Sequence, residues 1–494
     1  MTLASQPLKY VESLRSGGVA RCGASVSPHI AKLADRLKSG LVSIAAFGGS
    51  MTVGAVWQLC GHPHNGCDGI AYPVALGKQL VNHSVVRDAY VRNLGVGATH
   101  GAAVPALCVE NLLGFDLSTM TTHDAREGRL THVTQNSTTR QHMRNAYAKW
   151  QSIVDPVDIV LLEFSVNGIQ WLDQLLSRLR GLYPQAVMLY VDHFRLLDWR
   201  HWRNASNPAH QFRMTEDFST APECTHQLDH FLKEAGVTFW SLRKKLVHDG
   251  WGYQRATQIF HADKIHLRQW GHSLIGDGLW QELSRQLNSA SVSDHQQSPL
   301  QPPPQHLPTS MTPLGSSALS QATNALPHRS NRSSACYFWY RNKRVPREVH
   351  VEKHPNWSLR GQLTASEGDS GKYTFELMQA NRTNETQQLS LSFPTSEPCS
   401  VVRIGYMLHC CLYGVARFWL DGIVTAHVRG SVAGFPHHVL ETTSIGTVRN
   451  AGRHTLTVQV VEPGPNGLQQ FRLAGVFIGT TESMLATSNR SVWT

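Results

Sequence analysis

The first 287 residues of the chain alternate between two hydrophobic patterns. Short runs dominated by apolar residues predict strands, at Leu41–Phe47, Ser84–Arg92, Asp158–Phe164, Ala186–Val191 and Val237–Trp240. Amphipathic stretches between the runs predict helices, at Thr139–Ile153, Ile169–Leu182 and His226–Ala235. Apolar strands that alternate with helices indicate a parallel sheet covered on both faces. We therefore expect an α/β fold with three layers for this part of the chain.

The C-terminal part has a different pattern, in which apolar and polar residues alternate over short runs separated by turn residues. The runs are Gly371–Met378, Ser400–Met407, Ala416–Val428, Gly452–Val461 and Gln469–Gly479. Alternation with a period of two is typical of antiparallel strands that bury one face. The pattern predicts an all-β sandwich.

Between the two patterns lies a segment rich in Ser, Pro and Gln, with hardly an aromatic residue and no periodicity. This composition is typical of a linker. The chain is thus predicted to consist of an N-terminal extension (1–40), an α/β domain (41–287), a linker (288–335), a β-sandwich accessory domain (336–481) and a tail (482–494).

Composition narrows the classes of partner and compartment. The net charge of +10 is spread along the 494 residues, which indicates a solvated basic surface or, alternatively, attraction to an anionic polysaccharide. The chain contains no recognisable nucleic-acid-binding motif and no run of about 18 apolar residues that would span a membrane. No apolar segment in residues 1–40 has the length of a signal peptide core. Eight Asn-x-Ser/Thr sequons nevertheless favour a secreted or extracellular glycoprotein; they begin at Asn82, Asn136, Asn204, Asn331, Asn356, Asn381, Asn384 and Asn489.

Nine cysteines are an odd number, so at least one is unpaired within the chain. Cys60 and Cys67 enclose a short turn-rich loop that a disulfide could close. His62 and His64 within that loop leave a metal site as the alternative, although the spacing fits no zinc pattern. No P-loop, dinucleotide fingerprint or zinc ligand set is present, and we expect no cofactor and no metal.

Glycine and polar residues follow several predicted strands, at the sheet edge where catalytic groups of α/β proteins collect. Gly48 and Gly49 end the first strand and precede Ser50. Taken alone, Ser50 is better explained as the cap of the next helix. Asn167 could likewise cap a helix, and His266 with its neighbouring acid could be a surface pair.

Taken together and in order, these segments resemble the blocks of the SGNH, or GDSL-type, hydrolase superfamily, which supply a serine, a glycine, an asparagine and a histidine. The "GGS" at Ser50 is similar to the GDS of the first block, with Gly49 where Asp is usual. The "NLGVGAT" segment resembles the second block. Its loop glycine is best matched by Gly97, although direct counting places Ala98 there.

The third block is usually GxND and corresponds to "SVNG", which keeps Asn167 and has Gly168 in place of Asp. The last block, DxxH, is intact as Asp263 and His266. The resemblance covers about Leu41 to Leu287. It implies a three-layer flavodoxin-like sheet of the SGNH hydrolase type.

The resemblance also implies roles for these residues. Ser50 would attack an acyl carbonyl while neutral His266 accepts its proton, and Asp263 would fix the tautomer of the imidazole. On a helical turn, Asp263 and His266 would share one face. The backbone N–H groups of Ser50 and Gly97 (or Ala98) and the amide of Asn167 would form the oxyanion hole.

The leading hypothesis is therefore a serine esterase that hydrolyses carboxylic esters, with O-acetyl groups on a carbohydrate as the favoured substrates. An O-acyltransferase with the same residues and a non-catalytic glycan-binding protein on a decayed hydrolase scaffold are the alternatives. Three histidines near the predicted site, His193, His261 and His272, are expected to be mainly structural.

Overall fold

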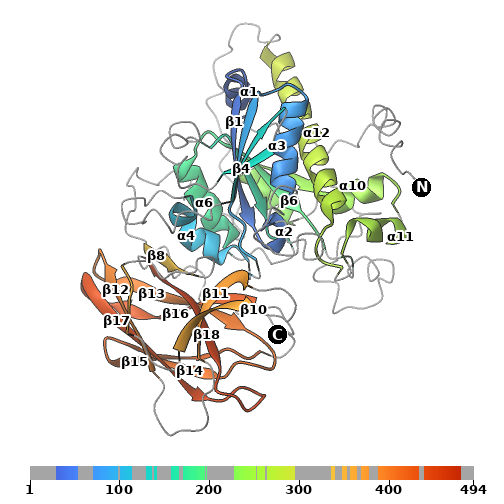
Figure 1. Ribbon diagram of the computed structural model, residues 1–494. Coiled ribbons are helices and arrows are strands. Elements are labelled where there is room, and N and C mark those ends of the chain that lie inside the picture. Colours follow the sequence, from blue (N-terminus) through green and yellow to red (C-terminus); the bar gives the residue numbers. More distant parts are fainter. Residues whose placement is uncertain are drawn as a thin grey trace, which may run out of the picture.

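The structure is a computed structural model, and it describes residues 29–53, 71–97, 99, 101–113, 129–135, 138–141, 157–165, 171–194, 196, 227–251, 253–261, 264–294, 335–339, 348–352, 357–363, 369–377, 388–432 and 439–479. These residues form an α/β part followed by an all-β part (Figure 1). The fold class predicted from the sequence is thus confirmed. The domain bounds remain a prediction, and one helix, α12 (Gln269–Asp294), extends into the segment predicted as linker.

The α/β part is built on a seven-stranded sheet with the order β4-β3-β2-β1-β5-β6-β7. The strands are β1 (Leu41–Gly48), β2 (Asp88–Asn93), β3 (Arg129–Thr134), β4 (Thr138–Gln141), β5 (Ile159–Glu163), β6 (Val187–Asp192) and β7 (Val237–Ser241). The strands from β2 to β7 in this order run parallel, and their carboxyl ends meet at one edge. β3 is antiparallel to β2, and β4 to β3.

Two sequence-based expectations were wrong, one about the element that begins near Thr139 and one about where β2 begins. The helix expected from Thr139 is not formed there, because Thr138–Gln141 pairs with β3 as a short edge strand. The strand expected from Ser84 begins only at Asp88, because Ser84 lies in a turn with a φ of 55°.

Helices cover both faces of the sheet. One face is covered by α1 (Ile30–Leu37), α3 (Tyr72–Asn82) and α12, together with the short α10 (Leu242–His248) and α11 (Tyr253–Ala256). The other face is covered by α4 (Ala103–Leu113), α6 (Leu172–Leu182) and α9 (Gln227–Glu234). Residues of β1 serve both cores, since Ile44 packs on the first face and Phe47 on the second. Among the described residues, no helix is both long and apolar enough to cross a membrane.

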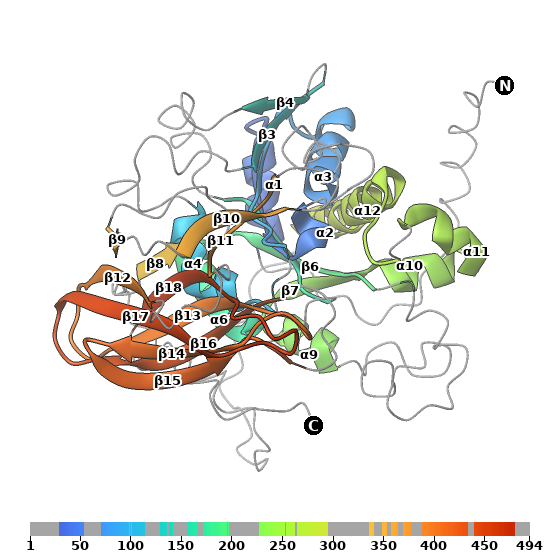
Figure 2. The same cartoon turned by 60° about the horizontal axis from the view of Figure 1, so that its bottom comes forward.

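The all-β part contains two antiparallel sheets that enclose one hydrophobic core (Figure 2). The first has the order β10-β11-β18-β13-β16, with β8 paired to β18: β8 (Ala335–Phe338), β10 (Trp357–Leu363), β11 (Asp369–Leu377), β13 (Ser400–Leu408), β16 (Val439–Val448) and β18 (Phe471–Gly479). The second has the order β15-β14-β17-β12-β9: β9 (His350–Glu352), β12 (Gln388–Thr395), β14 (Val415–Leu420), β15 (Ile423–Arg429) and β17 (Gly452–Glu462). The period-two pattern therefore predicted the sandwich correctly.

The sandwich lies against the face of the α/β part that α4 and α6 cover (Figure 1). A single hydrophobic cluster runs from these helices into β8, β13 and β18. A disulfide between Cys108 of α4 and Cys336 of β8 joins the two parts covalently. A second disulfide, Cys410–Cys411, lies in the turn after β13.

Candidate active site

The chain turns tightly after β1 because Gly48, the last residue of the strand, has no side chain. A Cβ added to Gly48 would lie 2.1 Å from the Thr52 Oγ1 atom and 2.5 Å from the Glu163 carbonyl oxygen. Both distances are far below any real contact, so only glycine fits this position. Ser50 follows as the first residue of the short helix α2 (Ser50–Val53), at the carboxyl edge of the sheet.

The segments that follow β1 and β2 and the last residue of β5 are linked by backbone hydrogen bonds, each of which involves the end of β1. The Val96 N–H donates to the Gly48 carbonyl at 2.8 Å, which places Gly97 beside the turn that carries Ser50. The Gly49 N–H donates to the Glu163 carbonyl at 3.3 Å, which brings the end of β5 to the same turn. The segments predicted to supply the nucleophile and the loop glycine thus meet at one place.

Ser50 and His266 are in hydrogen-bond contact. The Ser50 Oγ and His266 Nε2 atoms are 2.8 Å apart, although the two residues are separated by 216 positions in the chain. When the imidazole is neutral with its proton on Nδ1, Nε2 accepts from the serine hydroxyl. This is the arrangement in which a histidine can take the proton from an attacking serine.

His266 lies in a closed turn and not on a helix. The turn is closed by an antiparallel bridge between Phe260 and Leu267, and the His261 N–H donates to the His266 carbonyl at 2.8 Å. Lys264 has a φ of 59°, in the left-handed region. The expected helical turn from 263 to 266 is therefore wrong for its described residues, 264 to 266: His266 is aimed by the turn and its bridge.

Residues at the end of β6 contact this turn. The His193 ring lies within hydrogen-bond distance of the Ile265 carbonyl, with 3.1 Å between Nε2 and O, and the Leu196 N–H donates to the Lys264 carbonyl at 2.8 Å. Burial lowers the pKa of His193 to about 4, so the ring is neutral at pH 7. Because a carbonyl only accepts, Nε2 must carry the proton and donate. This contact agrees with a structural role for His193, which stays a prediction.

Thr52, which lies in α2 with Ser50, contacts several buried polar side chains. The Thr52 Oγ1 atom is 3.0 Å from the Tyr72 hydroxyl and 3.5 Å from Glu163 Oε2. The Asn93 amide donates to the Thr52 carbonyl at 2.5 Å, and the Asn93 Oδ1 atom accepts from the Gly95 N–H at 3.3 Å. Asn93 therefore ties α2 to the loop after β2. Sequence reasoning missed this link, although a polar residue that ends an apolar strand was a signal for it.

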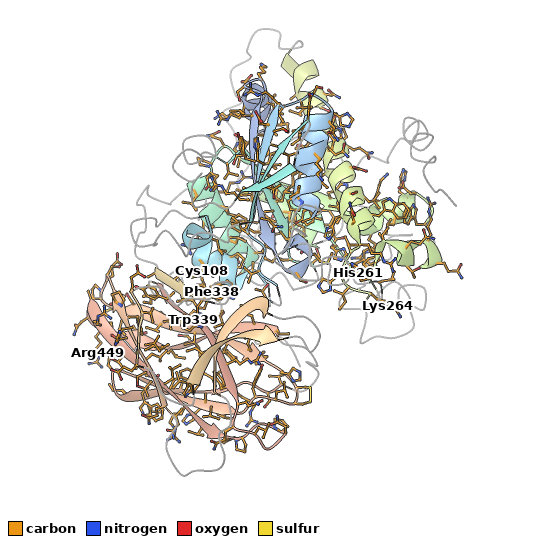
Figure 3. All side chains as sticks on the ribbon, viewed as in Figure 1. Cys108, His261, Lys264, Phe338, Trp339 and Arg449 are labelled. Atoms are coloured by element: carbon orange, nitrogen blue, oxygen red, sulfur yellow. A yellow bond between two sulfur atoms is a disulfide. The ribbon has the colours of Figure 1, made fainter. Side chains whose placement is uncertain are left out.

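Two further histidines, His261 and His272, are buried close to the residues described above. His272 is fully buried, and its ring stacks on that of Tyr72 with 6.4 Å between the centroids. Burial lowers the pKa of His272 to about 3, so it is neutral at pH 7. His261 is buried in the turn before His266 and lies beside Lys264 in Figure 3. Both positions agree with structural roles.

Several sequence-based expectations lie outside the described residues: Asn167, Asp263, Ala98, the Cys60–Cys67 loop and Gly168. Within the described ranges, no group of three or more His, Cys, Asp or Glu side chains could hold a metal ion. Of the predicted site, the structure thus brings together Ser50 and His266 and places Gly97 beside the Ser50 turn.

A serine that is hydrogen-bonded to a histidine at the carboxyl edge of a parallel sheet, as Ser50 is to His266, is suited to nucleophilic catalysis. Neither a protein-family model nor a curated protein matches the chain. Among solved structures, the chain is similar to a two-domain esterase active on acetylated mannans, with 16% identity, a TM-score of 0.48, and coverage of 92% of this chain and 95% of that chain. The same esterase co-crystallised with mannopentaose gives 16% identity, a TM-score of 0.47, and coverage of 91% and 94%.

The all-β part also has likenesses among solved structures. A family 35 carbohydrate-binding module from Clostridium thermocellum has 11% identity and a TM-score of 0.20, and the match covers 30% of this chain and 98% of the module. At these identities and TM-scores, none of the likenesses assigns a function to this chain. The functional argument therefore rests on the site itself.

Proposed function

We propose that the protein is a serine esterase of the SGNH type that hydrolyses carboxylic esters, with O-acetyl groups on a carbohydrate as its substrates. The observation that carries the proposal is the 2.8 Å contact between Ser50 Oγ and His266 Nε2 at the carboxyl edge of the sheet. The resemblance of the sequence blocks supports the type of hydrolase. The carbohydrate substrate is supported by analogy with polysaccharide deacetylases of that superfamily.

In the proposed reaction, His266 Nε2 takes the proton of Ser50 as Oγ attacks the acyl carbonyl. The oxyanion that forms is held by the backbone N–H groups of Ser50 and Gly97 and by the Asn167 amide. The alcohol leaves with the proton from His266. Water then attacks the acyl-serine with His266 as the base. The carboxylic acid is released, and the proton on His266 returns to the Ser50 Oγ atom, which restores the free enzyme. Asp263 would hold the imidazole in the required tautomer.

The first test is labelling of the full-length protein with a fluorophosphonate probe, read as intact mass. Wild type should gain one adduct, and Ser50→Ala and His266→Ala should gain none. Ser39→Ala, which changes an exposed serine in the turn before β1, is the matched control and should be labelled like wild type. Absence of an adduct on folded wild-type protein would refute an activated serine and favour the non-catalytic glycan-binding alternative.

The second test identifies the reaction. Acetate release should be measured from acetylated oligosaccharides, including acetylated manno-oligosaccharides, and from an aryl acetate as a small reference ester. Release that requires Ser50 and His266 would support a carbohydrate esterase. Transfer of the acetyl group to an added saccharide acceptor, in place of water, would show an O-acyltransferase. Hydrolysis of the aryl ester alone would contradict the carbohydrate substrate.

A further inference from the structure

The loop after β2, here called the oxyanion loop, is described at residues 94–97 and 99 and carries the proposed oxyanion donor Gly97. It contains a hydrogen bond of its own. The Thr99 hydroxyl donates to the Val96 carbonyl at 3.1 Å, and Thr99 is buried. On the side of the sheet, the Leu94 and Val96 N–H groups donate to the Ala46 and Gly48 carbonyls, both at 2.8 Å. The loop is otherwise irregular backbone, so the position of its other side depends on what packs against it.

A strand of the β-sandwich pairs with the far side of this loop. Thr99 forms a parallel β-bridge with Leu440 of β16, although the two residues belong to different parts of the chain. The Leu440 side chain is fully buried in the cluster that both parts share. The cluster contains Val104 and Leu107 of α4 together with Phe338, Met407 and Phe477 of the sandwich.

The helix that follows the loop is fixed to the same domain. α4 begins at Ala103, and its Cys108 is disulfide-bonded to Cys336 of β8. Figure 3 shows Cys108 and Phe338 where α4 meets the sandwich. The loop and the helix after it are thus held by the sandwich at two points, at Thr99 by the bridge and at Cys108 by the disulfide.

A further contact between the two parts involves Trp171, which follows the proposed oxyanion donor Asn167 in the chain. Arg403 of β13 is buried, and its guanidinium carbon lies 4.8 Å from the centroid of the Trp171 ring. Trp171 has a φ of 68° and precedes α6, four positions after Asn167. A buried cation over an indole ring is a favourable contact that fixes the orientation of the ring.

From these contacts we propose that the β-sandwich holds the oxyanion loop in its working position and that Leu440 is a positioning residue for the reaction. The sandwich is then a structural part of the catalytic unit and not a module on a tether. Oxyanion donors act only when they are held within about 0.5 Å of the productive geometry, at hydrogen-bond distance from the oxygen that carries the developing charge. The inference rests on the proposed esterase function and deepens it.

The test compares two truncations in the full-length protein. Leu440→Ala shortens a side chain in the cluster that also contains Leu94 and Val96 of the loop. Leu456→Ala makes the same change in the separate core of the sandwich. Both should lower the melting temperature. Leu440→Ala should also lower kcat for an aryl acetate by about 10- to 100-fold with KM nearly unchanged, a fraction of what loss of a whole donor costs. Leu456→Ala should keep the wild-type kcat. The conservative variant Leu440→Met should keep most of the wild-type kcat as well, in contrast to Leu440→Ala.

A second variant and a second readout keep the inference separate from folding and from the proposed function. The double variant Cys108→Ser with Cys336→Ser should lower kcat in the same way as Leu440→Ala. Hydrogen exchange should rise at residues 94–113 in Leu440→Ala and not in Leu456→Ala. Equal kcat values for both leucine variants would overturn the inference. If wild type has no esterase activity, the proposed function fails, whereas unchanged exchange in Leu440→Ala would overturn the positioning role.

Discussion

Replacing His193 with Gln should weaken the loss of stability that acid causes. The His193 ring is buried against Phe260 and next to Asp192, His266 and Arg243, and burial lowers its pKa to about 4 from 6.5. Below pH 6.5 the unfolded chain therefore binds a proton that the folded protein rejects until about pH 4. Stability from this group is fully present above pH 6.5 and is lost as the pH falls towards 4.

The size of the effect follows from the two pKa values. At about 1.4 kcal/mol per pKa unit, the difference between 6.5 and about 4 corresponds to roughly 3 kcal/mol, which is lost in full once the pH falls below both pKa values. Gln cannot titrate in this range, and its amide can still donate to the Ile265 carbonyl as the ring does. The variant should therefore lose a smaller part of its stability than wild type on going from pH 7.5 to pH 4.5.

The assay is urea unfolding of both proteins, followed by tryptophan fluorescence at half-unit pH steps. The two stability curves should run parallel above pH 7, which serves as the internal control, and converge or cross below pH 6. Curves that stay parallel down to pH 4.5 would refute the assignment of a buried neutral imidazole. His272, whose pKa burial lowers to about 3, adds an acid-sensitive contribution of the same sign to both proteins.

Two further substitutions probe the turn that presents Ser50. Gly48→Ala should abolish the proposed esterase activity and lower the melting temperature, because the new Cβ would lie 2.1 Å from Thr52 Oγ1; a wild-type melting curve by calorimetry would contradict this. Asn93→Ala should cost about 1–3 kcal/mol in urea unfolding, since it leaves the Thr52 carbonyl and the Gly95 N–H without their buried partner. The same variant should lower kcat more than it raises KM, and an unchanged kcat would show that this link does not align the two segments.

The sequence predicted the elements whose residues are apolar over most of their length. The five parallel strands of the α/β part and the longer strands of the sandwich were found because burial leaves a clear pattern. The strand at Thr138–Gln141 was missed because a short polar edge strand has no such pattern. The turn around Lys264 was taken for a helix because a spacing of three suits both.

The candidate site was predictable only where residue type carries the chemistry. Ser50 and His266 were chosen because their segments resemble, in order, the blocks that supply a nucleophile and a base in the SGNH superfamily, and their contact agrees with that choice. The support around them had no such signature. The Cys108–Cys336 pair is separated by 228 positions, and the bridge between Thr99 and Leu440 uses backbone groups that every residue has.

The disulfide between Cys108 and Cys336 also has a consequence for biosynthesis. Cys336 leaves the ribosome 228 residues after Cys108. At about 5–20 residues per second, this separation corresponds to roughly 10 to 45 seconds of translation. A nascent chain that already contains Ser50 and the first sheet strands therefore waits for the sandwich before the link can form. The covalent attachment of α4 therefore cannot precede the synthesis of β8, and it requires oxidising conditions.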